Sequence, residues 1–460
     1  MDLADSIQAK SEMARIPTLL PERGAWRPIH YLGSKLRVLP ALDAAIGSVA
    51  SKGEAICDLF AGSGTVAAWL AQSRPVTAVD IQEYSRVICD ALLNPAHISL
   101  ASVKAELTRR LAEAVDSGVT FAAEPLVKFE TEALVQASEG ELAPLASLIE
   151  AGSLMTFRDG GGSGGLGVAF DQTRARLAAL DFPSVASMAL RHFGGVYFSY
   201  RQAAELDVIL EYAHSSGPAL RSTLIAATLS TASDLVNTVG KHFAQPLRPR
   251  NKSGTIKPSL YNQASKDRCK SVLEVFVDKL ARYLTLPDVS YENRAVRSDY
   301  MEFLTSPGFD CGVVYADPPY TRDHYSRFYH VLETLALRDD PDISTNTAHG
   351  KTVLSRGIYR QDRHQSPFCI RSEASAAFDE LFGRVAMRGV PLVLSYSPYA
   401  SEKNAHPRVM TMEGVTELAR QHFRSVDVSS VGSFFHSRLN RSDLNKDISY
   451  DAEYLLTCRP

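Results

Sequence analysis

The sequence predicts an α/β fold, a doubly wound sheet interrupted by a long, mostly helical insertion. Residues 54–80 contain two short apolar runs separated by a turn and a helical pattern, which indicates a strand–helix–strand unit. A further apolar run at residues 312–316 predicts another buried strand. Between these regions, residues 96–289 carry helical periodicity over long stretches. The order of these segments places an insertion inside one sheet domain.

Length and composition set the domain organisation. The chain of 460 residues is long for one domain, and 45% of its residues are apolar, which suffices for a packed core. The first ten residues show no signal peptide, and no apolar run is long enough to cross a bilayer. We therefore expect a soluble cytoplasmic protein without a membrane partner. The expected divisions are residues 1–25 as a loose arm, 26–95 and 290–460 as the sheet domain, and 96–289 as the insertion.

Charge and cysteine content exclude several classes of protein. The net charge is −3, so any surface that attracts nucleic acid must be local. The six cysteines are scattered and form no CxxC pair. This spacing predicts buried thiols in a reducing compartment, and neither a disulfide framework nor a metal site.

The first predicted helix follows a short turn. Gly33 permits this turn, and the helical pattern runs from Leu36 to Val49 with Pro40 near its start. Lys35 places a cation where the helix dipole disfavours one, which suggests an anionic partner. The alternative is a solvated surface lysine.

The strand–helix–strand unit has features of a nucleoside site. Gly62 and Gly64 form its first turn and allow the backbone to approach a ligand closely. Asp80 follows the second strand, where an acid commonly binds ribose hydroxyls. No Lys-Ser/Thr pair follows the glycines, and Asp58 would repel a phosphate. The pattern favours a cationic nucleoside without phosphate, such as S-adenosylmethionine; the alternative is a structural turn.

The insertion combines helices with a basic segment. Helical patterns cover Leu100–Val115, Tyr200–Tyr212 and Leu220–Val239. Residues 241–270, which we call the basic strip, contain eight Lys and Arg and one acid, Asp267, and their prolines predict a loop. We expect the strip to bind phosphates, the alternative being a solvated connection. The cations expected to bind are Lys241, Arg248, Arg250, Lys252 and Lys257.

The most informative stretch is Asp317-Pro318-Pro319-Tyr320. Two prolines end the preceding strand because neither can donate a ladder hydrogen bond. Asp317 therefore stands at the carboxyl end of a strand, where ligands bind in open α/β sheets. A carboxylate, a rigid turn carbonyl and an aromatic ring suit a planar substrate that carries an amine. The alternative is an ordinary strand that ends in a Pro-Pro turn.

The remaining elements complete the predicted sheet. Residues 340–368 are polar and are predicted to form a mobile loop. If the basic strip does not bind phosphate, this loop and residues 321–329 are the alternative surfaces. Helices are expected at Met301–Leu304, His330–Leu337 and Ala374–Met387. Strands are expected at Leu392–Ser397, Ser425–Val431 and Ile448–Thr457.

Taken together, the motifs resemble those of the Dam-like, D12-class DNA adenine-N6 methyltransferases, and they occur in the family's order. The matching pieces cover roughly residues 26–95 and 290–460, and the insertion lies where such enzymes carry a target-recognition domain. The motifs that resemble the family's cofactor site are Tyr31-Leu32-Gly33-Ser34-Lys35, Asp58-Leu59-Phe60-Ala61-Gly62-Ser63-Gly64-Thr65, Asp80 and Asp299-Tyr300. The motif that resembles its catalytic site is Asp317-Pro318-Pro319-Tyr320.

The resemblance implies a seven-stranded methyltransferase sheet with one antiparallel strand, S-adenosylmethionine as cofactor, double-stranded DNA as substrate and no metal. Asp80 would hold the ribose of the cofactor and Asp299 its adenine amine. Asp317 and the Pro318 carbonyl would accept the two N6 protons of a flipped adenine, on which Tyr320 would stack. The remaining residues expected at the cofactor are Tyr31, Gly33, Ser34, Lys35, Asp58, Phe60, Gly62, Gly64, Thr65 and Tyr300.

Other functions remain open at this point. Cytosine-N4 methylation uses the same chemistry on an exocyclic amine, although its motif usually begins with Ser. RNA as the substrate is a second alternative. A component that binds cofactor and nucleic acid without catalysis is a third, disfavoured because Asp317 and Tyr320 are both present. The recognition sequence, the oligomeric state and a restriction or phage-defence partner are not readable from the sequence.

Overall fold

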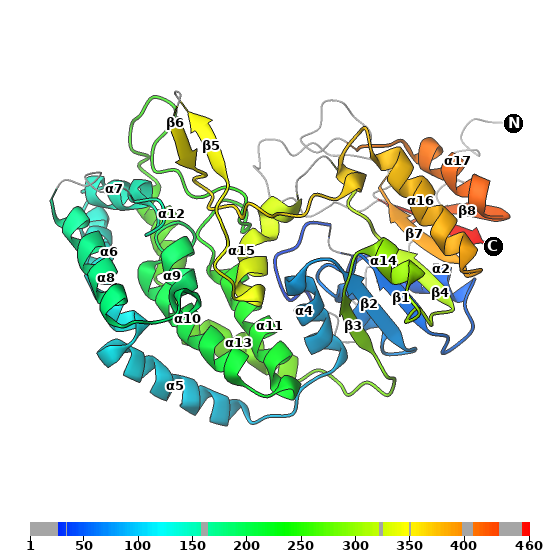
Figure 1. The fold of residues 1–460 in the computed structure, drawn as a ribbon, viewed down its shortest axis with the longest axis horizontal. Coiled ribbons are helices and arrows are strands. Elements are labelled where there is room, and N and C mark those ends of the chain that lie inside the picture. The colour runs from blue at the N-terminus through cyan, green and yellow to red at the C-terminus, as the bar shows by residue number, and fades with distance from the viewer. Residues whose placement is uncertain are drawn as a thin grey trace, which may run out of the picture.

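The computed structural model describes residues 26–33, 35–157, 164–321, 325–348, 351–397, 408–431 and 453–460. The predicted arm, residues 1–25, and Ser34 lie outside this set. A sheet flanked by helices occupies one side of the molecule, and a large group of helices occupies the other (Figure 1). Within the described residues, no helix is both long and apolar enough to span a membrane.

A seven-stranded sheet forms the first half, with the strand order β3-β2-β1-β4-β7-β9-β8. β9 runs antiparallel to both of its neighbours, and the other strand pairs are parallel. The predicted α/β sheet with one antiparallel strand is therefore present. Its strands are β1 (Ile56–Leu59), β2 (Val76–Asp80), β3 (Arg294–Arg297), β4 (Val313–Ala316), β7 (Leu392–Tyr396), β8 (Ser425–Ser430) and β9 (Tyr454–Arg459).

Both faces of the sheet are covered by helices, as expected for parallel strands with continuous apolar sequences. On β4, Val313 and Tyr315 pack with α2 and α3, whereas Val314 and Ala316 pack with α14, α16 and α17. The covering helices are α2 (Leu39–Gly47), α3 (Thr65–Leu70), α4 (Glu83–Leu93), α14 (Tyr300–Thr305), α16 (Ala374–Met387) and α17 (Met412–His422).

The strand register aligns the predicted site residues along one rim. Leu59 of β1 is paired with Val79 of β2 and with Ala316 of β4. The next residue on each strand, namely Phe60, Asp80 and Asp317, therefore lies at the same carboxyl edge. The chain order reverses between β1 and β4, which is where open α/β sheets bind ligands.

The helical group is built mainly from the predicted insertion. The predicted helix at Leu100–Val115 is α5, and the helix predicted to end at Val239 is α11, which ends at Leu235. Its helices are α5 (Leu100–Ser117), α6 (Val119–Ser138), α7 (Ala143–Ala151), α8 (Gly165–Ala179), η1 (Ser184–Ser187), α9 (Met188–Phe193), α10 (Tyr200–Ser215), α11 (Pro218–Leu235), α12 (Leu260–Arg268) and α13 (Val272–Leu284).

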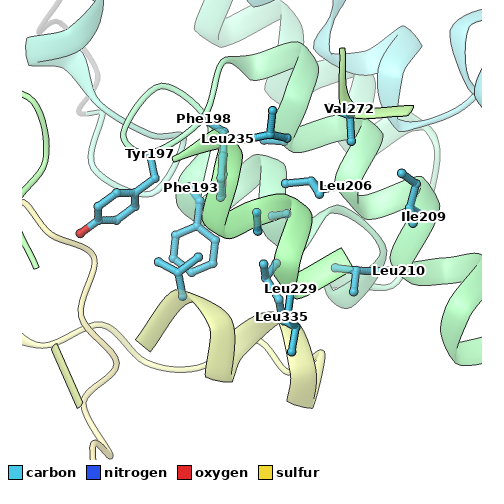
Figure 2. Packing of buried hydrophobic residues seen from close by; sticks show 14 of the residues in the cluster. Phe193, Tyr197, Phe198, Leu206, Ile209, Leu210, Leu229, Leu235, Val272 and Leu335 are labelled. Atoms are coloured by element: carbon cyan, nitrogen blue, oxygen red, sulfur yellow. The ribbon is translucent and has the colours of Figure 1, made fainter. Parts of the chain in front are cut away.

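The apolar core of this helical group extends beyond residues 96–289. Leu335 of α15 (Tyr325–Leu337) is buried in one cluster with Phe193 and Leu229 (Figure 2). Val87 and Ile88 of α4 belong to the same cluster. Two helices of the predicted sheet domain thus share a core with the insertion.

Two predicted loops contain regular structure. Residues 340–368 were expected to be irregular, but they include the antiparallel strands β5 (Thr345–Ala348) and β6 (Lys351–Leu354) and the short helix η2 (Pro367–Cys369). Thr and Val favour extended pairing, and this preference outweighed the polar composition. The end of the basic strip forms α12, which begins at Leu260, two residues after Pro258. Proline restricts its own backbone and that of the preceding residue, so it does not prevent a helix from starting after it. Cys269 is exposed, unlike the other five cysteines, which are buried as predicted.

Candidate functional site

A pocket opens at the carboxyl rim of the sheet. The predicted residues that line it include Tyr31, Gly33, Lys35, Phe60, Asp80, Asp299, Tyr300, Asp317, Pro318, Pro319 and Tyr320. They come from the ends of β1, β2, β3 and β4 and from the turn before α2. Segments distant in sequence, around Tyr325 and His364, complete the wall. The predicted cofactor and catalytic motifs are therefore brought to one cavity.

The Asp317 carboxylate is held by a buried cation. Lys35 Nζ lies 3.0 Å from Asp317 Oδ1 and also forms an ion pair with Glu453. The Ser395 hydroxyl donates a hydrogen bond to the same Glu453 carboxylate. Lys35 is 5% exposed, whereas Asp317 is 22% exposed and faces the pocket. The anionic partner expected for Lys35 is thus a pair of carboxylates within the protein.

This arrangement sets the protonation of both groups. Burial raises the pKa of Asp317 to about 7; Lys35 opposes the rise, and Glu453 adds to it. Burial lowers the pKa of Lys35, but Asp317 and Glu453 outweigh it and raise that pKa well above its usual value. Lys35 therefore stays charged, while the Asp317 carboxyl titrates near neutrality.

Asp80 has structural hydrogen bonds in addition to its place in the pocket. Its carboxylate accepts the N–H groups of Gly62 and Gln82, each at 2.9 Å. Burial raises the pKa of Asp80, and these two donors oppose the rise. The side chain therefore fixes both the turn after β1 and the start of α4.

The two glycines of that turn are required by packing within the protein. A Cβ atom at Gly62 would lie 2.5 Å from Tyr31 Oη, and one at Gly64 would lie 2.8 Å from Leu92 Cδ1. Both residues have positive φ angles. The structure gives each glycine a packing role: Gly62 accommodates the Tyr31 ring, and Gly64 accommodates α4. That these glycines admit the cofactor stays a prediction.

Asp58 and Thr65 also stand behind the pocket wall and are not among the residues that line it. Burial raises the pKa of Asp58 well above its usual value, and Asp317 and Asp80 reinforce this. Asp58 Oδ2 has no hydrogen-bond partner in the described part of the chain. The Thr65 hydroxyl lies 3.0 Å from the Ser63 hydroxyl. Asp58 and Thr65 were predicted to contact the cofactor, but the structure places neither at the pocket surface.

Aromatic rings form much of the remaining wall. Tyr31 stacks on Tyr329 with a centroid distance of 4.9 Å, and Phe60 lies 5.1 Å from Tyr300. Phe60 adopts a positive φ angle of 63°, which is rare for a bulky residue and turns the chain at the strand end. These rings supply flat apolar surfaces for the rings of a nucleoside or base.

Asp299 and Tyr320 have additional partners. Asp299 caps α14 by accepting the Met301 N–H at 2.8 Å. The Tyr320 ring centroid lies 4.9 Å from the Arg408 guanidinium carbon and 5.6 Å from Lys35 Nζ. Tyr320 therefore reaches the pocket as part of a cation–π group, which fixes the orientation of its ring.

Several pocket residues were not found from the sequence. Tyr325, Tyr329, His364 and Pro367 line the cavity although they follow no strand end. The aromatic residues at 325–329 could have been recognised, because their helical spacing continues the apolar face of α15. Nothing local marked Glu453, whose partner Lys35 is 418 residues away in the sequence.

The basic strip is partly neutralised within the protein. Lys241 was predicted to bind phosphate. In the structure it forms an ion pair with Asp267 and donates hydrogen bonds to two backbone carbonyls. Arg250 pairs with Glu150 on the surface. Lys257 donates to the Arg248 carbonyl. Arg248 and Lys252 are exposed and carry no carboxylate partner within the described residues.

The charges of the pocket define the ligand that it suits. Its lining includes three carboxylates, Asp80, Asp299 and Asp317, whereas Lys35 is already paired. Such a surface disfavours phosphate and suits a cationic nucleoside. Within the described residues, no group of three or more His, Cys, Asp or Glu is placed to hold a metal ion.

Comparison with known proteins finds similarity in the N-terminal part of the chain, which supplies Tyr31, Lys35 and Asp80 to the pocket. The family model of the D12 class N6 adenine-specific DNA methyltransferases matches residues 31–122, which confirms the resemblance of the two N-terminal motifs. The chain is 28% identical over 146 residues to modification methylase LlaI of Lactococcus lactis subsp. lactis, covering 31% of this chain and 21% of that protein. It is 31% identical over 116 residues to type II methyltransferase M.FokI of Planomicrobium okeanokoites, covering 25% and 16%. The matched segments thus span about a fifth or less of these relatives.

Proposed function

We propose that this chain is a site-specific DNA methyltransferase that transfers a methyl group from S-adenosylmethionine to the N6 amino group of adenine in double-stranded DNA. The observation that carries the proposal is the position of Asp317, at the end of a buried strand in the pocket that Phe60, Asp80 and Asp299 also line. The similarity of residues 31–122 to the adenine-specific family supports it.

The pocket residues fit the cofactor by charge and shape. Asp80 and Asp299 offer carboxylate acceptors for ribose hydroxyls and an adenine amine, and Phe60 and Tyr300 offer apolar surface to the adenine ring. The carboxylates favour the net cationic character of S-adenosylmethionine over a phosphorylated nucleotide. When bound, the cofactor supplies an electrophilic methyl group on its sulfonium.

Asp317 and the turn after it perform the chemistry. The adenine amino lone pair is delocalised into the ring, so the amine is a poor nucleophile until its protons are held. Asp317 and the Pro318 carbonyl accept hydrogen bonds from the two N6–H groups of a flipped base and so orient the lone pair. Pro318 and Pro319 fix the carbonyl because their φ angles are restricted. The Asp317 carboxylate then stabilises the positive charge that develops on nitrogen.

Lys35 supports this role by keeping a proton acceptor available. Its cation favours the ionised form of Asp317, which burial and Glu453 disfavour. Glu453 holds Lys35 in position through an ion pair, and Ser395 holds Glu453 through a hydrogen bond. Tyr320, oriented by its cation–π contacts, provides pocket-facing aromatic surface for the base.

The helical group is the part that we assign to target recognition, with the exposed cations of the basic strip as backbone contacts. The depletion of acids in the strip supports this assignment. Any restriction or phage-defence partner would bind outside the pocket.

The test is nucleoside analysis of duplex DNA after incubation with the purified chain and S-adenosylmethionine. We expect N6-methyladenine with the wild type and none with Asp317→Ala or Asp317→Asn, because neither variant stabilises a cation on nitrogen. Calorimetric titration should show cofactor affinity within about tenfold of wild type for both variants, since the contact matters most in the transition state. N4-methylcytosine, or methylation of RNA in place of DNA, would refute the substrate assignment. Transfer by Asp317→Ala at near wild-type rate would refute the catalytic one.

A further inference from the structure

Two arginines without carboxylate partners flank Tyr359, and two more lie close to this group. Tyr359 has the guanidinium carbon of Arg363 at 5.2 Å from its ring centroid and that of Arg327 at 5.7 Å. Arg356 Nη2 donates to the Leu247 carbonyl at 3.0 Å, which places it beside Arg248. We call Arg248, Arg327, Arg356 and Arg363 the arginine cluster.

The cluster joins three parts of the chain. Arg327 lies on α15, Arg356 and Arg363 lie after β6, and Arg248 comes from the basic strip. The Tyr359 hydroxyl donates to the Ala244 carbonyl and ties the second of these parts to the third. In Figure 1 the β5–β6 hairpin lies above the helical group.

No ion pair neutralises the positive charge of the cluster within the described residues, although Glu150 and Asp362 lie near enough to raise the pKa values of Arg356 and Arg363. Burial lowers the pKa of Arg363, and Arg327 lowers it further; burial and Arg248 do the same to Arg356. The nearest acids have other partners, because Glu150 pairs with Arg250 and Asp362 pairs with Arg360. Within the described residues, none of the four arginines forms an ion pair.

Two members of the cluster, Arg327 and Arg363, are next in sequence to residues that line the pocket. Tyr325 and Ser326 line the pocket immediately before Arg327, and His364 lines it immediately after Arg363. A nucleotide that inserts its base into the pocket must leave its phosphates at the mouth, because the carboxylates inside repel them. Guanidinium groups are the side chains that best match phosphate oxygens, through paired hydrogen bonds.

We propose that the arginine cluster around Tyr359 binds the backbone phosphates of duplex DNA beside the nucleotide whose base enters the pocket. This inference rests on the proposed function. The Tyr359 ring holds two of the guanidinium groups by cation–π contact and so preorganises them. Arg327, Arg356 and Arg363 lie within the two runs that were alternatives to the basic strip, and Arg248 lies in the strip itself.

The test compares two double variants of equal charge. Arg327→Gln with Arg363→Gln removes two cluster cations, whereas Arg109→Gln with Arg384→Gln removes two exposed helical arginines that pair with acids on α5 and α16. Binding of a fluorescent DNA duplex is measured by anisotropy at several salt concentrations between about 0.05 and 0.3 M. Each phosphate contact contributes about 0.9 to the slope of log K against log salt. The cluster variant should reduce the slope of log K against log salt by about 2 and weaken binding on the order of 10- to 100-fold at 0.1 M salt. The control variant should bind as wild type.

A further variant separates the tyrosine from the charge. Tyr359→Leu should weaken DNA binding while leaving the salt slope unchanged, because no cation is lost. Calorimetric cofactor titration verifies that each variant is folded around an intact pocket. A wild-type slope in the cluster variant, while the wild-type protein methylates DNA, overturns this inference alone. Tighter, cluster-dependent binding of an RNA duplex overturns the DNA assignment, and absence of DNA methylation by the wild type overturns the proposed function instead.

Discussion

At the scale of single residues, Asp317 is one member of a buried charge network. Lys35 lies between Asp317 and Glu453, and Ser395 holds Glu453 from the neighbouring strand. The raised pKa of Asp317, about 7, means that its ionised form predominates only above neutrality. Because proton acceptance requires that form, the single-turnover rate of methyl transfer should fall as pH falls through about 7.

Glu453→Gln tests the network. Glu453 raises the pKa of Asp317, so removing its charge should lower that pKa and move the pH–rate profile toward acid. Lys35→Met should move the profile toward base, because Lys35 lowers the same pKa. Single-turnover rates at saturating cofactor across pH 5–9, a window about two units either side of neutrality, measure both shifts. Profiles that move in the same direction in both variants would contradict the network.

Gly64 gives a second test at this scale. Gly64→Ala meets Leu92 Cδ1 at 2.8 Å and Cys89 Sγ at 3.2 Å at a φ of +71°. We expect it to lower the free energy of unfolding by about 2–4 kcal/mol through strain and overpacking. Gly53→Ala is the control, since Gly53 has a similar φ of +78° but nothing within 4 Å of a Cβ. It should cost only about 1 kcal/mol in urea denaturation; equal costs would show that backbone strain alone matters.

At the scale of elements, the sequence predicted those whose signal is local. The limits of α16 match the prediction, and α5 differs only at its end, because an apolar period marks both helices and Ser99 caps α5. α15 begins five residues before the predicted His330, because its first turn reads as polar although Tyr325 and Tyr329 face the pocket. β5 and β6 pair only with each other, so their stability depends on a contact that composition does not show.

The candidate site divides in the same way. Asp80 and Asp317 could be predicted because each stands at the end of a strand, and parallel strand ends meet at one rim. Asp299 was expected from the family resemblance alone. Asp58 and Gly64 have the family spacing, but neither lines the pocket: Asp58 is buried behind the wall, and Gly64 packs closely against Leu92 of α4. Glu453 and the arginine cluster could not be predicted, since their partners come together only through tertiary packing.

A buried ion pair joins two helices of the helical group. Arg268 of α12 pairs with Glu130 of α6 at 2.6 Å and also donates to Asn237 and to the Gly195 carbonyl. Arg268→Ala should destabilise the protein by about 3–5 kcal/mol, because Glu130 would be left buried without a counter-charge. Arg250→Ala, which breaks the surface pair with Glu150, should cost about 1 kcal/mol or less.

A double variant tests whether the unpaired buried charge of Glu130 causes this loss of stability. Arg268→Met combined with Glu130→Gln removes both charges and keeps an acceptor for the Tyr200 N–H. It should be more stable than Arg268→Ala in the same denaturation experiment, although it carries more substitutions. A double variant that is less stable would assign the cost to lost packing.

At the scale of the whole molecule, the two halves share a core. α4 and α15 contribute Val87, Ile88, Leu332 and Leu335 to the apolar cluster of the helical group. The division at residues 96–289 therefore remains a prediction about sequence organisation, while packing crosses it.

A deletion variant tests how far the sheet depends on the helical group. Replacing residues 96–289 with a short glycine linker would expose the apolar faces of α4 and α15 to water. We expect the variant to aggregate and to show neither cooperative unfolding nor cofactor binding by calorimetry. A soluble deletion variant that binds cofactor with wild-type affinity would show that the sheet folds independently.

The placement of β9 between β7 and β8 has a consequence for the order of events during synthesis. β8 leaves the ribosome before β9, yet its hydrogen-bonding partner in the sheet is β9. β8 must therefore wait without a ladder until β9 has emerged. Glu453, which immediately precedes β9, arrives at the same moment, long after Lys35 and Asp317. The charge network around Asp317 is consequently completed only after β9 has emerged, long after the rest of the pocket has been synthesised.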